Sequence, residues 1–144
     1  MSDTTPAAFD PKCRNPQLNT QDFKAGAAIL AGQAVSFHGT GVSWTVHPTV
    51  AATTTGFVGI AAYSQATVGG KVAVHMVGSI CKVCEGKGSA IDAGDYLMEC
   101  SVAGCVATGT DSADISYLGQ ALEDIDANGT GYCVIIPQYS AKGA

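Results

Sequence analysis

The chain has 144 residues, of which 47% are hydrophobic, and a net charge of −5 at pH 7. A chain of this length buries roughly two-thirds of the surface of its unfolded state, which is enough for one compact domain. No Lys or Arg lies between Gly88 and Ala141, where eight acidic residues fall. An acidic surface repels phosphate, so we expect no direct binding of nucleic acid. These charges either keep loops solvated or form a face that meets a basic partner.

The beginning of the chain carries no sign of export. Met1 is followed by polar residues, with neither a basic start nor an apolar run, so we expect no secretory signal. No stretch approaches the roughly 20 apolar residues that cross a bilayer. We therefore expect no membrane partner, synthesis in a cytoplasm, and six cysteines that remain thiols.

Residues 1–24 differ in composition from the rest of the chain and predict an extended N-terminal arm. Three of the five prolines fall here, five residues apart: Pro6, Pro11 and Pro16. Proline donates no hydrogen bond and biases its neighbour to extended backbone. The few apolar residues follow no period of 2 or 3.6: Phe9, Leu18 and Phe23. The arm is either a frayed terminus or a segment that orders on a neighbouring protein, for example by strand addition.

Residues 25–144 contain an internal repeat. Val58-Gly59 aligns with Leu118-Gly119 at a shift of sixty positions, and Ala28-Ile-Leu-Ala-Gly aligns with Ala90-Ile-Asp-Ala-Gly at a shift of sixty-two. Each half predicts an Ile-x-Ala-Gly turn, a hairpin, a Gly-x-Ala strand, a Gly-containing turn and a closing strand. The expected fold is all-β, a small β-barrel or β-tulip-like domain in which two pseudo-repeated half-units make one closed β-structure.

Alternation of apolar and polar residues locates the strands. It predicts a hairpin over residues 34–47, a strand over 57–62 that is covered on both faces, a turn at Gly69-Gly70, and a strand over 79–84. The 18 glycines fall at turn positions between β-branched residues, as in a many-stranded domain. We expect no helix.

The cysteines offer one alternative function. Cys81-Lys-Val-Cys84 has the spacing of a zinc-ligand pair, and the second pair would be Cys100 and Cys105. Against zinc, positions 81 and 84 of a strand point to opposite faces, and four intervening residues are unusual in a zinc knuckle. We therefore favour buried or half-buried thiols over a metal site.

Two further motifs yield to simpler interpretations. Asp124-Ile-Asp-Ala-Asn-Gly129 copies the start of a calcium loop, but Ile135 stands where the bidentate Glu is required, so a hairpin turn at Asn128-Gly129 is favoured. Lys82 and Lys87 lie between the halves, as the modified lysine of a lipoyl or biotinyl carrier does, but without the flanking Met or Asp-Lys-Ala context. No catalytic arrangement is recognisable, so we expect no enzyme and no cofactor.

The order of these motifs resembles a known family over about residues 25–137. The segments Phe-Val-Gly-Ile-Ala, Val-Gly-Gly-Lys-Val-Ala-Val-His-Met-Val-Gly, Gly-Ser-Ala-Ile-Asp-Ala-Gly-Asp-Tyr-Leu, Leu-Gly-Gln-Ala-Leu-Glu-Asp and Val-Ile-Ile-Pro follow one another. They resemble the capsid decoration, or cement, proteins of tailed bacteriophages, and are similar to the lambda-type head decoration protein.

This resemblance implies a structural virion protein made in the host cytoplasm. It implies a homotrimer on the outer surface of the mature head, bound to the major capsid protein, which stabilises the head against the pressure of internal DNA. It also implies an arm that orders on the major capsid protein. Residues 1–24 lie outside the resemblance, and from their composition we expect these contact residues: Phe9, Pro11, Pro16, Leu18 and Phe23. The alternative is a small β-barrel carrier or metal-binding domain.

Overall fold

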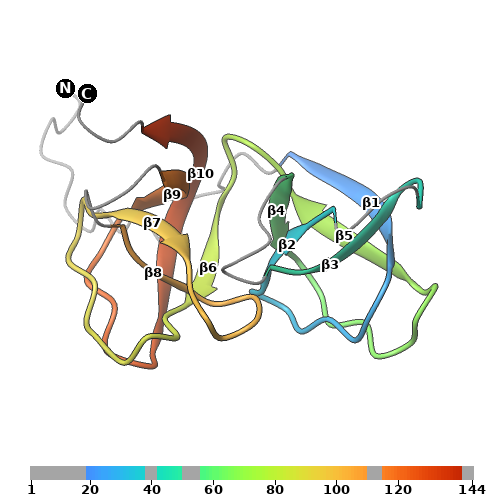
Figure 1. Ribbon diagram of the computed structural model, residues 1–144, viewed down its shortest axis with the longest axis horizontal. Helices are drawn as coiled ribbons and strands as arrows, with labels where there is room; N and C mark the ends of the chain where they lie inside the picture. The colour runs from blue at the N-terminus through green and yellow to red at the C-terminus, as the bar shows by residue number, and fades with distance from the viewer. Residues whose placement is uncertain (1–18, 38–41, 50–55, 110–114, 141–144) are drawn as a thin grey trace, which may run out of the picture.

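The computed structural model describes residues 19–37, 42–49, 56–109 and 115–140. Ten strands run through these residues, and no helix occurs among them, so the all-β prediction is confirmed. Figure 1 shows two β-structures side by side along the long axis of the molecule, with strand β6 where they meet.

The first half of the chain builds a closed barrel with strand order β1-β3-β2-β4-β5, in which β1 also pairs with β5. All its strand pairs are antiparallel except β1 with β3. The strands are β1 (Thr20–Ala25), β2 (Ala34–Ser36), β3 (Thr45–Pro48), β4 (Phe57–Ala61) and β5 (Lys71–His75).

The second half builds a five-stranded sheet in the order β6-β10-β9-β7-β8. Its two outer strands approach each other again at an isolated parallel bridge between Glu85 and Val106, where the Gly86 N–H donates to the Val106 carbonyl at 3.0 Å. The strands are β6 (Ile80–Cys84), β7 (Tyr96–Glu99), β8 (Val106–Thr108), β9 (Ile115–Ala121) and β10 (Thr130–Ser140).

The two halves repeat one topology. Around the first barrel the strand order is β1-β5-β4-β2-β3. The order in the second sheet is β6-β10-β9-β7-β8, which is the same order with five added to each strand number. The repeat predicted from the sequence is therefore present, but each half forms a sheet of its own, and the first of these is a closed barrel. The expectation of one closed β-structure shared by both halves is corrected, because five short strands suffice to wrap one small core.

Equivalent glycines show why the halves keep the same close contacts. A side chain at Gly59 would collide with the backbone carbonyl oxygen of His75, and one at Gly119 would collide with that of Val134. Only glycine lets neighbouring strands approach this closely at these positions.

Alternation places one face of each strand in a core. On β5, Val72 and Val74 are buried while Lys71 is exposed, as the period of two in a strand requires. The predicted hairpin is confirmed by the antiparallel pairing of Ser36 with His47, and the turns by positive φ at Gly69 and Asn128.

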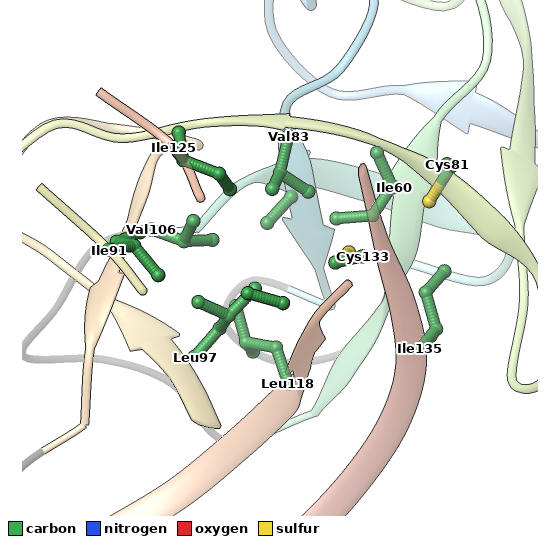
Figure 2. Packing of buried hydrophobic residues seen from close by; sticks show 12 residues of the cluster. Ile60, Cys81, Val83, Ile91, Leu97, Val106, Leu118, Ile125, Cys133 and Ile135 are labelled. Carbon is green, nitrogen blue, oxygen red and sulfur yellow. The ribbon is translucent and has the colours of Figure 1, made fainter. Parts of the chain in front are cut away.

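Two hydrophobic clusters fill the halves, and the second crosses the boundary between them. It holds buried residues of the second sheet together with Ala34 and Ile60 of the first barrel. Figure 2 shows Ile60 beside Cys81 and Val83 of β6 in this cluster. The Ala34 N–H also donates to the Gly104 carbonyl at 2.8 Å. The halves are therefore packed together rather than linked only by chain.

Candidate functional site

Hydrogen bonds to Ser79 and Met76 hold Asn19, the first described residue, where the two halves meet. The Asn19 N–H donates to Ser79 Oγ at 2.9 Å, and the Met76 N–H donates to the Asn19 carbonyl at 2.6 Å. Ser79 directly precedes β6 and is buried. Asn19 therefore lies at the junction of the halves.

The structure corrects the predicted arm at its C-terminal end. Phe23 lies on β1, is 6% exposed and packs in the core of the first barrel, so residues 20–24 belong to the barrel and not to an arm. The prediction fails because Phe23 has polar neighbours, so the sequence around it lacks the alternation of apolar and polar residues that indicates a strand. Four other predicted contact residues lie outside the described residues: Phe9, Pro11, Pro16 and Leu18.

An aromatic patch, which we define as Phe37, Val42 and Trp44, lies on the first barrel. These side chains are 46%, 66% and 60% exposed. The rings of Phe37 and Trp44 contact buried Phe23, with centroids 6.0 Å and 5.7 Å from its ring. Trp44 also has a φ of 59°, which is unfavourable for a bulky residue. Exposed aromatics on a rigid base are typical of interaction surfaces.

A groove of about 420 Å³ separates the first barrel from β6. Residues 31–32, 61–62 and His75 line one wall, and β6 with Tyr132 lines the other. Lys82 lies over the Tyr132 ring at 5.6 Å, a cation–π contact. Lys82 is in mid-strand rather than at a hairpin tip, which removes the geometry that a carrier lysine requires.

The predicted zinc residues do not meet at one point. Cys81 lies opposite Cys133 on β10, and both are buried in the second cluster, where Figure 2 labels them. Cys84 points away from that core and contacts Cys105 instead. Among the described residues no group of three or more His, Cys, Asp or Glu side chains is arranged to hold a metal ion. The cysteines of the described residues are thiols, as expected.

Sequence reasoning missed two buried carboxyl groups, those of Glu85 and Glu99, and the more deeply buried is Glu85, which is 2% exposed. It accepts backbone hydrogen bonds from Gly88 at 2.8 Å and Asn128 at 2.9 Å, and others from Lys87 and Ser89. Burial favours the protonated form, but these hydrogen bonds outweigh it and hold the pKa of the carboxyl below its ordinary value. The signal in the sequence is slight, a Glu next to the Gly-Lys-Gly of a tight loop. Glu85 therefore holds the backbone of the loop after β6 and of the turn at Asn128.

The acidic residues of the second half serve partly as local supports. Asp95 Oδ2 accepts from the Asp92 N–H at 3.0 Å and from Thr108 Oγ1 at 3.2 Å, and Asp124 Oδ1 accepts from the Ala93 N–H at 2.8 Å. The predicted turn at Asn128 is closed by the Gly129 N–H, which donates to the Asp126 carbonyl at 2.8 Å. The calcium interpretation is not needed to explain this loop.

No helix within the described part of the chain is long and apolar enough to span a bilayer. No protein-family model matches the chain, and no curated protein matches it. Its fold is similar to the crystal structure of the N base of head fiber gp8.5 in bacteriophage phi29, at 17% sequence identity and a TM-score of 0.57. The similarity covers 83% of this chain and 95% of that one, so both halves are included. The two proteins share a fold.

Proposed function

We propose that this protein is a structural component of a phage virion, attached to the outer surface of the head as a decoration, or cement, protein. The observation that supports the proposal is the fold likeness to the base of a phage head fiber over 83% of this chain. The motif order of residues 25–137 points independently to capsid decoration proteins. The partner is the major capsid protein, and no cofactor or catalysis is involved.

Attachment uses the N-terminal arm, now taken as residues 1–18. The arm joins the fold at Asn19. Ser79 binds Asn19 at the junction of the halves, so the point of attachment of the arm is fixed relative to both halves. Phe23 is withdrawn from the contact set because it is buried in the barrel. The contact residues in the arm are Phe9, Pro11, Pro16 and Leu18.

The protein acts as a homotrimer. Three arms on one rigid body turn a weak peptide contact into a tight one, because the second and third bind at high effective concentration. A three-fold trimer also matches a three-fold position between capsomers without distortion. Such a trimer stabilises the expanded shell against internal DNA pressure because it binds that state and not the precursor.

Sedimentation with capsids of the encoding phage tests this function. Purified protein is mixed with empty expanded capsids, and separately with unexpanded precursor shells, and the pelleted fraction is measured. We expect saturable pelleting with expanded capsids only, and a free protein of about 43 kDa by light scattering, three times the 14.5 kDa chain. Equal pelleting with both shells, or none with either, contradicts the proposal.

A further inference from the structure

Two thiols face each other where strands β6 and β8 close the second sheet, a place we call the seam. Cys84 directly precedes Glu85 and Cys105 directly precedes Val106, and these two successors form the parallel bridge. In a parallel pair, the residues one position earlier on each strand are also neighbours, with side chains on one face. The Cys84 thiol also lies close enough to the Cys105 thiol to raise the pKa of Cys105.

The first barrel shows the same register at its own seam. Sixty positions before Cys84 and Cys105 stand Lys24 and Thr45, which are direct Cα partners of β1 and β3. Neighbouring strands lie about 4.8 Å apart. That spacing falls inside the Cα separation of about 4.4–6.8 Å that a disulfide accepts. The repeat therefore places Cys84 and Cys105 at bonding distance through the backbone alone.

A second thiol pair on the same strand differs in its access to solvent. Cys81 and Cys133 are also directly opposite each other, but they are only 6% and 2% exposed in the core. Cys84 and Cys105 are half-buried, and Cys84 lines the groove between the halves. A small oxidant can reach the seam pair and not the core pair.

We propose that Cys84 and Cys105 form a disulfide that closes the second sheet when the protein meets a low-molecular-weight disulfide such as oxidised glutathione. The Cys84 thiolate attacks one sulfur of that disulfide and releases one glutathione thiolate. The Cys105 thiolate then attacks the Cys84 sulfur of the mixed disulfide and releases the second. Two protein thiols become one disulfide and one glutathione disulfide becomes two glutathione thiols, so electrons and protons balance.

The order of attack follows from the surroundings of the two thiols. Burial and the neighbouring Cys84 thiol raise the pKa of Cys105 to about 12, so Cys105 is protonated at rest. Cys84, which lines the groove, is therefore the first to attack. A nearby third thiol, Cys100, donates to the Val102 carbonyl at 3.7 Å, and burial raises its pKa as well.

Closure matters because this seam is weakly held. The first barrel has two register pairs between β1 and β3, whereas the second sheet has one isolated bridge. A bond between positions 84 and 105 closes a loop in the unfolded chain and so favours the folded state. The bond forms after the protein leaves a reducing cytoplasm. This inference does not depend on what the protein binds.

The test is to incubate the full-length protein with oxidised glutathione, alkylate the remaining thiols under denaturing conditions and map the peptides by mass. Cleavage at acidic residues separates Cys84, Cys105 and Cys133, and fragmentation distinguishes Cys81 from Cys84 and Cys100 from Cys105. We expect a Cys84–Cys105 link with Cys81 and Cys133 alkylated. The oxidised protein is expected to melt about 5 °C or more above the reduced protein.

The variants Cys84→Ser and Cys105→Ser each lose the link and the gain in melting temperature. Cys100→Ser keeps both, which makes it the matched control. A link that uses Cys81, Cys100 or Cys133, a stable glutathione adduct on Cys84 with Cys105 alkylated, or six free thiols after oxidation overturns the proposal.

Discussion

The carboxylate of Glu85 accepts the backbone N–H of Asn128 at 2.9 Å, and so joins the end of β6 to the turn that leads into β10. Asn128 needs such a support because its φ is 56°. The same carboxylate accepts three N–H groups of the loop after β6, from Lys87, Gly88 and Ser89. Sixty positions earlier the first barrel has Ala25, so this support belongs to the second half only.

Replacing Glu85 with Gln is expected to lower the free energy of unfolding by about 1.5–3 kcal/mol at pH 7. The NH₂ group of Gln would face the backbone N–H groups that the carboxylate now accepts. The negative charge that strengthens the remaining hydrogen bonds is also lost. Urea unfolding at pH 7 measures the change. The exposed turn residue Asp126, changed to Asn, is the matched control and should stay within about 0.5 kcal/mol of the wild type.

The pH dependence of the same variant is a separate prediction. The folded-state pKa of Glu85 lies below the unfolded value, so its stabilisation is present above about pH 4.3 and is lost as the pH falls through the folded-state pKa. The difference between wild type and Glu85→Gln should therefore shrink in acid. A difference that is constant from pH 7 to pH 3 would show that the charge is not responsible.

Glu99 at the end of β7 behaves in the opposite way. Burial raises the pKa of its carboxyl to about 7, and Oε2 has no hydrogen-bond partner within the described residues. The folded state holds this proton to higher pH than the unfolded chain, so stability is full below about pH 4.3 and falls as the pH rises through 7. Glu99→Gln should exceed the wild type by about 1–2 kcal/mol at pH 8 and equal it at pH 4.5. A wild type that is equally stable at both pH values argues against this.

Ile60 joins the two halves, since it lies on β4 and packs in the cluster of the second sheet. Ile60→Ala leaves a cavity and should cost about 2–5 kcal/mol, with one unfolding transition for the whole chain in the wild type. Ile136→Ala, at a side chain 37% exposed, is the control with a smaller loss. Two separate wild-type transitions would mean that the halves fold independently.

The aromatic patch is expected to contribute to attachment rather than to stability. Trp44→Ser should lower affinity for expanded capsids at least about tenfold, because aromatic anchors dominate interface energies. Tyr63→Ser removes a side chain 70% exposed elsewhere on the first half and serves as the control. Pelleting at graded protein concentrations gives both affinities, and equal values for the two variants would exclude the patch from the contact.

Removing residues 1–18 should leave a folded protein with an unchanged light-scattering mass that no longer pellets with expanded capsids. Asn19 and Thr20 are kept because they belong to the fold. Removing only residues 1–5 keeps every proposed contact residue and should leave pelleting intact. Full binding by the shorter chain would mean that the arm is not the attachment device.

The sequence predicts the repeat well because both halves meet the same local constraints. Gly59 and Gly119 align because each lets β4 or β9 approach the neighbouring strand, and the turn at Asn128 is visible because Asn-Gly favours positive φ. The alternation of buried and exposed side chains on β5 can also be predicted, because it depends only on residues that are neighbours in the sequence.

What the sequence could not predict depends on contacts distant in the chain. Phe23 is buried because β1 pairs with β5 and β3, and nothing in its polar surroundings indicates those partners. Cys84 lies beside Cys105 because Glu85 and Val106 form a parallel bridge, and these two residues are far apart in the sequence. Each half forms a sheet of its own because of which strand edges meet, and residue periodicity carries no information on that choice.

The most direct measurement is cryo-electron microscopy of empty expanded capsids of the encoding phage after incubation with this protein. We expect three-fold-symmetric density on the outer surface between capsomers, into which three copies of this fold dock, with extra density leading from Asn19 onto the major capsid protein. Bare capsids at saturating protein, or density without three-fold symmetry, would contradict it.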